Sequence, residues 1–85
     1  MATAKDRRIA RRIEEILRLR NSSLANELVG VDCVRTLPAE IRERIIEELG
    51  EEFSKKGLSP DNEPNAYGME IEDLTDACAP WHDEP

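Results

Sequence analysis

Apolar side chains recur along the N-terminal segment at the spacing of one helical face. They are Ile9, Ile13, Ile16 and Leu17, at positions i, i+4, i+7 and i+8. A helix with about 3.6 residues per turn places all of them on one side. Thr3 is a suitable cap, and Asp6 brings a negative charge to the first turn, where the helix dipole favours it. The pattern predicts a helix over residues 4–20.

The next segment has a shorter apolar pattern. Ser22 or Ser23 is suited to cap a new helix, because a hydroxyl oxygen can accept a hydrogen bond from a free backbone N–H. The apolar side of this helix would consist of Leu24, Leu28 and Val29. Gly30 and the β-branched Val31 favour an end there. We therefore expect a short helix over residues 23–31, followed by a short connection.

The clearest helix start lies in TLPAEIRERIIEELGEEFSKKG, residues 36–57. Pro38 suits the first turn, because its φ is fixed and its missing N–H would be unsatisfied there. One apolar stripe follows, made of Ile41, Ile45, Ile46, Leu49 and Phe53. Gly57 offers a left-handed stop, so the expected helix covers residues 38–56. Gly50 lies inside it at a cost of about 1 kcal/mol relative to alanine, and we expect it to let another helix approach closely.

Residues 59–65, SPDNEPN, form a turn-rich linker. After the linker, another stripe places apolar side chains at i, i+4, i+7 and i+11. These residues are Tyr67, Ile71, Leu74 and Cys78. The pattern predicts a helix over residues 66–79, with Asn65 as its candidate cap and Pro80 just after its end.

Together the stripes predict an all-α fold, a small bundle of three to four short amphipathic helices. Residues 1–80 are expected to form a single helical domain, since 85 residues is near the smallest size at which one core is stable without metals or disulfides. Residues 81–85 form an acidic tail, with Trp81 expected to fold back over the core. No apolar run approaches the roughly 20 residues that span a bilayer. With no secretory pattern at the N-terminus, we expect a cytoplasmic protein without a membrane partner.

Charge is unevenly distributed along the chain. The formal net charge is −7, but residues 1–20 carry seven basic and three acidic side chains. Residues 60–85 carry eight acidic side chains and no Lys or Arg. The cationic and anionic segments therefore attract each other within the fold, or one of them attracts a partner.

Carboxylates stand close together in YGMEIEDLTDAC, residues 67–78. On a helix, Glu72, Asp73 and Asp76 fall on the side opposite the apolar stripe, with Glu70 between the two sides. Acid/base catalysis needs a carboxylate in a semi-buried pocket that raises its pKa. Calcium binding needs an alternating loop of oxygen ligands. The pattern therefore predicts a solvated face, and we assign no catalytic, cofactor-binding or metal-binding residue.

The two cysteines do not form a metal or redox motif. Cys33 and Cys78 are 45 positions apart, and Pro80 interrupts any helix between Cys78 and His82, the one histidine. We expect both thiols to be reduced and partly buried as small apolar groups. A disulfide between them stays open as the alternative in an oxidising compartment.

These features favour a noncatalytic protein-interaction or regulatory module that binds another protein or a second copy of itself. The chain is short for covering all its amphipathic segments, and a face of one charge suits a partner of the opposite charge. The candidate contacts are Glu72, Asp73 and Asp76 on an acidic face and Arg7, Arg11 and Arg18 on an arginine face. Leu19 and Met69 fall outside the stripes and are expected to be exposed. No small-molecule ligand is predicted, and solubility is the simpler interpretation of the acidic residues.

Nucleic-acid binding through the first helix is the alternative function. The arginines that would contact phosphates are Arg7, Arg8, Arg11, Arg12 and Arg18. Glu14 and Glu15 lie on the same helix, where they can pair with Arg18 and Arg11, and no aromatic residue interleaves with the arginines. This function is therefore less favoured. LPAEI, residues 37–41, resembles the Leu-Pro-x-Glu-Ile opening of F-box helices, but the rest of that pattern, including its later Trp, is missing, so no family is assigned.

Overall fold

The chain folds into helices and connecting loops over residues 2–78, the part that this computed structural model describes. The elements in chain order are α1 (Ala4–Leu19), η1 (Ser23–Leu28), η2 (Val34–Thr36), α2 (Ala39–Lys56) and α3 (Ala66–Cys78), where η denotes a 3-10 helix. In that range, strand-type pairing is limited to an isolated bridge between Leu58 and Pro64. The predicted all-α class is confirmed.

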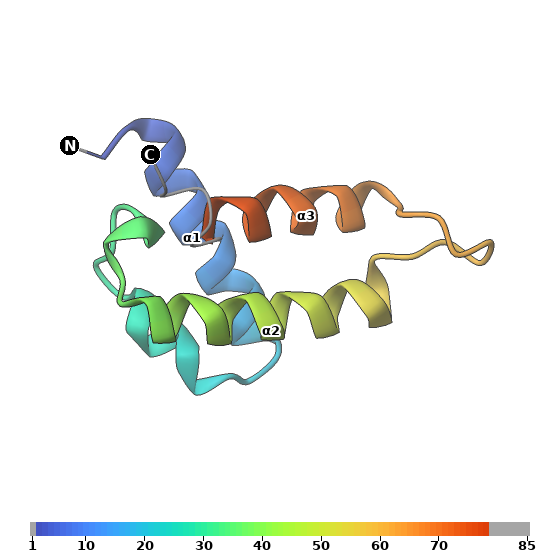
Figure 1. The fold of residues 1–85 in the computed structure, drawn as a ribbon, viewed down its shortest axis with the longest axis horizontal. Coiled ribbons are helices and arrows are strands. Elements are labelled where there is room, and N and C mark those ends of the chain that lie inside the picture. Colours follow the sequence, from blue (N-terminus) through green and yellow to red (C-terminus); the bar gives the residue numbers. More distant parts are fainter. Residues whose placement is uncertain (1, 79–85) are drawn as a thin grey trace.

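The helices α2 and α3 form an antiparallel pair, and α1 crosses behind it in the view of Figure 1. The contact between α2 and α3 is the most extensive in the fold, and η1 packs mainly on α1. Each helix buries one apolar side against the others, which gives a single core. Its largest fully buried side chains are Ile13, Ile16, Leu17, Leu28, Ile45, Leu49, Ile71 and Cys78.

The start of α1 is held by a reciprocal cap. The hydroxyl of Thr3 accepts a hydrogen bond from the Asp6 N–H at 3.0 Å, and the Asp6 carboxylate accepts one from the Thr3 N–H at 2.9 Å. Each side chain thus satisfies a backbone donor that the helix leaves free. The predicted apolar face of α1 is buried, with Ile9 half-buried at its edge. The helix ends at Leu19, within one residue of the prediction.

The segment between α1 and α2 differs from the expected helix over residues 23–31. Only Ser23–Leu28 is helical, as the 3-10 helix η1 capped by Ser22. The chain then leaves the core at Val29, which is 62% exposed although we expected it on the apolar side. Gly30 turns the chain with φ of 77°. So short a segment has little helical stability of its own, and its packing on α1 decides its conformation.

Helix α2 follows Pro38 and ends at Lys56, within one residue of the prediction. Its apolar stripe packs as expected, with Ile45 and Leu49 fully buried. The remaining stripe residues, Ile41, Ile46 and Phe53, are partly buried against the core. Two charged residues that the stripe did not indicate, Arg42 and Glu52, are also buried, at 8% and 2% exposed.

The close approach predicted at Gly50 and the left-handed conformation predicted at Gly57 are both wrong. Gly50 is exposed, and a Cβ built on it would meet nothing within 4 Å, so no helix approaches there. Gly57 does end the helix, but with φ of −90° and ψ of 0°, outside the left-handed region. The close approach lies instead between Gly57 and Gly68, because a Cβ on Gly68 would overlap the carbonyl oxygen of Gly57.

Asn65 fastens the turn between α2 and α3. Its Oδ1 accepts a hydrogen bond from the Gly68 N–H at 2.8 Å, which makes it the predicted cap of α3. Its Nδ2 donates to the carbonyl of Lys56 at 3.0 Å, and its backbone N–H donates to the carbonyl of Gly57 at 3.0 Å. One side chain therefore satisfies backbone groups at the end of one helix and the start of the next.

The buried side of α3 matches the predicted stripe. Ile71, Leu74 and Cys78 are buried, and Tyr67 is half-buried at the edge. Cys33 and Cys78 are both free, as expected. The predicted helix end at residue 79, the Trp81 lid and the acidic tail over residues 81–85 lie outside the described residues. Among residues 2–78, no helix combines the length and the apolar character needed to cross a membrane.

Candidate functional site

Arg20, directly after α1, joins the first helix to the acidic side of α2. Its guanidinium donates to the carboxylate of Glu48 at 2.9 Å and to that of Glu51 at 2.6 Å. A third N–H donates to Glu52 at 3.1 Å. The hydrogen bond to Glu48 raises the pKa of Arg20 against the opposing effect of burial. A single arginine thus ties the end of α1 to two turns of α2.

Glu52 links this cluster to α3. The hydroxyl of Tyr67 donates to Oε2 of Glu52 at 2.7 Å, while Arg20 holds Oε1. Burial acts to raise the pKa of Glu52, but the hydrogen bonds from Tyr67 and Arg20, with the charge of Lys56, outweigh it and lower the pKa. Glu52 therefore stays ionised at neutral pH. Glu52 thus links α2 to Arg20 and to Tyr67 of α3, and its lowered pKa is the opposite of the shift that a general acid requires.

The same contacts make Tyr67 hard to ionise, which gives a testable pH dependence. Burial and the neighbouring Glu52 raise the pKa of Tyr67 from 10.0 to about 12. Because the folded pKa is the higher one, the stability that this pair contributes is complete below pH 10.0 and is lost as the pH rises towards about 12. Tyr67 is the one tyrosine of the chain, so the ultraviolet absorbance of tyrosinate follows it directly. We expect a titration midpoint near 12 in the folded protein.

A matched variant separates the two causes of this shift. Glu52→Gln keeps the side-chain shape but removes the negative charge, so it should move the midpoint of Tyr67 downward. Tyr67→Phe should remove the tyrosinate signal. An ordinary midpoint near 10.0 in the wild-type fold would contradict the buried contact between Tyr67 and Glu52.

Arg12 pairs the cationic helix with the anionic segment. Its Nε and Nη2 donate to the carboxylate of Glu70 at 2.9 and 3.1 Å. Its guanidinium also lies 5.9 Å from the ring centroid of Tyr67, within the range of a cation–π contact. The attraction between α1 and α3 that the charge pattern allows is thus present inside the fold, through Glu70 on the side of α3 between its buried and outer faces.

The predicted arginine face of α1 is exposed but partly used within the protein. Arg7, Arg11 and Arg18 are all exposed. Arg18 pairs with Glu14, as predicted for residues four apart. Glu15 pairs with Arg12 rather than with Arg11, at 3.6 Å. Arg7 and Arg11 form no ion pair within residues 2–78, so they are what remains of this face for an external partner.

The predicted acidic face of α3 stays open to solvent. Glu72, Asp73 and Asp76 are exposed, and none of them forms an ion pair with another described residue. Met69, one turn earlier on the same side, is 61% exposed, as predicted. These four residues therefore give α3 an outer face that combines negative charge with one apolar side chain.

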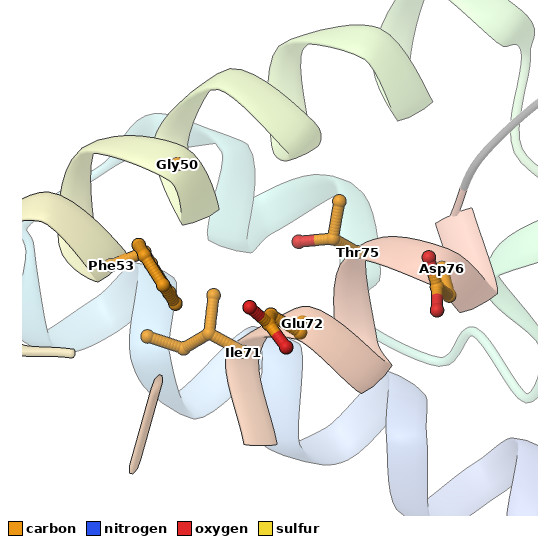
Figure 2. A pocket seen from close by; sticks show the side chains of 6 residues that line it. All are labelled: Gly50, Phe53, Ile71, Glu72, Thr75 and Asp76. Atoms are coloured by element: carbon orange, nitrogen blue, oxygen red, sulfur yellow. The ribbon is translucent and has the colours of Figure 1, made fainter. Parts of the chain in front are cut away.

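A groove between α2 and α3 opens beside the acidic face. Its volume is about 320 Å³, at the lower end of the range for small binding pockets, roughly 300–1,000 Å³. The lining residues are Gly50, Phe53, Ile71, Glu72, Thr75 and Asp76. Figure 2 shows Phe53 of α2 facing Ile71 of α3, with Glu72 and Asp76 following one another along α3. Because Gly50 has no side chain, the α2 wall of this α2–α3 groove stays open.

Cys78 lies in the core, where its thiol is fully buried. Burial raises the pKa of the Cys78 thiol to about 12, and a buried thiol of that kind is a poor nucleophile at neutral pH. Within residues 2–78, no three His, Cys, Asp or Glu side chains gather where they could hold a metal ion. The groove itself combines an apolar base with carboxylates along one rim.

Comparisons with known proteins supply no relative for this chain. Models of protein families, curated proteins and solved structures all give no match. Function therefore has to be inferred from the geometry of the fold and its surfaces.

Sequence reasoning found the acidic face and missed the groove. The helical period places Glu72, Asp73 and Asp76 opposite the buried stripe, and the structure agrees. The groove depends on how far α2 and α3 separate along their length, which no single helix pattern contains. Gly50 was the available signal, because a glycine inside a helix leaves a gap in its surface. We interpreted that gap as room for a helix of the same chain.

Proposed function

We propose that this protein is a noncatalytic interaction module that binds another protein through the α2–α3 groove and the neighbouring acidic face. The observation that carries the proposal is the groove itself, a hollow of about 320 Å³ with Phe53 and Ile71 at its base. A partly exposed aromatic ring in a concave surface is a typical anchor point for a partner side chain.

The distribution of charge supports this choice of surface. Glu48, Glu52 and Glu70 are neutralised by arginines of the same chain. Glu72 and Asp76, which border the groove, have no such partner within the described residues. Charges that the fold does not use for its own stability are free to interact with a partner of opposite sign. Solubility alone accounts for exposed carboxylates, but it gives no reason for an apolar hollow beside them.

Nucleic-acid binding through α1 is the second candidate. It is favoured by the exposure of Arg7, Arg8 and Arg11, which form no ion pair among residues 2–78. It is weakened because Arg12 and Arg18, two of the five candidate arginines, are paired with glutamates of the same chain. Phosphate binding gains its strength from several cations acting together, and too few remain on this face to outweigh a net charge of −7.

Capture of partners by immobilised protein tests the proposal. Gly50→Gln places a side chain in the groove, and Glu43→Gln places the same side chain at an exposed site on the same helix, about two turns away. Neither change should destabilise α2, since glutamine is a good helix former. We expect a protein in source lysate, treated with nuclease, to bind the wild type and Glu43→Gln but not Gly50→Gln.

Two outcomes would argue against this function. Equal capture by all three proteins would mean that the groove is not the binding surface. If the captured material is lost after nuclease treatment, or if its amount falls steeply between low and moderate salt, the arginine face would be the binding surface instead. Thermal melts by circular dichroism should accompany each capture, so that loss of binding is not confused with loss of fold.

A further inference from the structure

We propose that the occupant of the α2–α3 groove is a cationic amphipathic segment of another protein. One apolar side chain would enter against Phe53 and Ile71, and Lys or Arg side chains next to it would pair with Glu72 and Asp76. This inference rests on the proposed function and specifies the chemistry of the partner.

The apolar part of the argument comes from the size and walls of the groove. Phe53 is partly buried, so part of its ring is accessible from the groove. Ile71 is 1% exposed and closes the floor of the groove as part of the core. The accessible apolar area is therefore small. The groove is lined by about one and a half turns of α3, from Ile71 to Asp76. That length suits a single anchoring side chain. The open wall at Gly50, where nothing lies within 4 Å of a Cβ position, gives the anchor room to enter.

The cationic part comes from the spacing of the rim carboxylates. Glu72 and Asp76 are four residues apart on α3, so they lie on the same side of the helix, about 5–6 Å apart at Cβ. A partner segment crossing this rim can bring basic side chains to both carboxylates while its apolar side faces the groove. Met69, 61% exposed and one turn earlier, extends the contact with a flexible apolar side chain.

The net charge of the whole protein favours a foreign segment over a second copy of this chain. A second copy would bring another formal charge of −7 to the surface, and like charges oppose association at moderate salt. A basic segment is attracted to the same surface by the long-range field of the negative charge, and after docking by ion pairs with the carboxylates. We therefore assign the groove to a partner that carries net positive charge at the site of contact.

Selection from a random peptide library on the immobilised full chain tests this assignment. The most enriched peptide is then synthesised with a twin in which every Lys and Arg is replaced by Gln. Both are titrated into isotope-labelled protein and followed by NMR. We expect the enriched peptide to carry Lys or Arg beside a large apolar residue, and to shift the amides of Gly50, Phe53, Glu72 and Asp76. The neutral twin should bind much more weakly.

Variants convert the prediction into fold-changes in affinity. The double variant Glu72→Gln and Asp76→Asn should weaken binding by about 2- to 25-fold. This is the factor expected when the binding free energies of two exposed ion pairs are lost together. Glu27→Gln with Glu43→Gln removes the same charge from exposed sites elsewhere and should leave affinity within about twofold. Gly50→Gln should weaken binding by about tenfold or more, because the glutamine side chain would occupy the space that the partner's apolar side chain enters.

Several results would overturn the assignment. They are enriched peptides without basic residues, a neutral twin that binds as tightly, shifts that map away from the groove, and the absence of any enriched peptide. A dimer in sedimentation that Gly50→Gln abolishes would assign the groove to a second copy instead. If lysate capture still depends on the groove in any of these cases, the interaction function stands and only the chemistry of the partner is wrong. If capture fails as well, both proposals fail.

Discussion

Replacing Ile45 with aspartate is expected to leave the protein without a cooperative unfolding transition. Ile45 is 0% exposed and lies on the buried face of α2. Moving an unpaired carboxylate into an apolar environment costs several kcal/mol even after the group takes up a proton. The lost isoleucine contacts add to that cost. The free energy of unfolding of the whole domain is expected to be only on the order of 5–10 kcal/mol. This substitution therefore removes most or all of that stability.

Circular dichroism during thermal and denaturant unfolding measures this effect. Ser54→Asp is the matched control, because it adds the same charge to an exposed position of α2. Its carboxylate lies near the C-terminal end of the helix, where the dipole disfavours it by about 0.3–1 kcal/mol. A melt of Ile45→Asp that resembled the control would show that the assigned core face of α2 is wrong.

The substitution Gly68→Ala is expected to have the second largest effect. The added methyl group would overlap the carbonyl oxygen of Gly57 and lie 2.9 Å from its carbonyl carbon. These atoms belong to the backbone at the end of α2, so no side-chain rotation can relieve the overlap. Overpacking costs about 1–3 kcal/mol where side chains adjust. We expect a loss at or above the upper end of that range, measured as a lower denaturant midpoint.

Gly50→Ala is the control for this prediction and should have the opposite sign. It makes the same chemical change inside a helix, but its methyl group meets nothing within 4 Å. Alanine loses less conformational freedom than glycine on folding, so the expected gain is about 0.5–1 kcal/mol. Equal effects at the two sites would contradict the close contact between Gly57 and Gly68. A gain at Gly50→Ala would also mean that the glycine, which keeps the groove wall open, makes the fold less stable than alanine would.

Local patterns in the sequence predict the long helices well. The spacing of Ile13, Ile16 and Leu17 assigns the buried face of α1 correctly, because that spacing repeats every helical turn. Thr3 and Asn65 are found as caps for the same reason, since each cap bonds to backbone groups only a few residues away. The expected helix over residues 23–31 fails because so short a segment takes its conformation from what it packs against.

The sequence by itself determined the class of fold, the apolar residues on the buried face of each long helix and the exposure of Glu72, Asp73 and Asp76. All of these follow from helical periodicity, which is a local property of the chain. Only the tertiary structure decided which glycines meet, which arginines are bound by glutamates and where the groove opens. The partners in these contacts lie far apart in the sequence, as Arg12 and Glu70 do. Their pairing depends on the packing of whole helices, and periodicity within one helix holds no information about it.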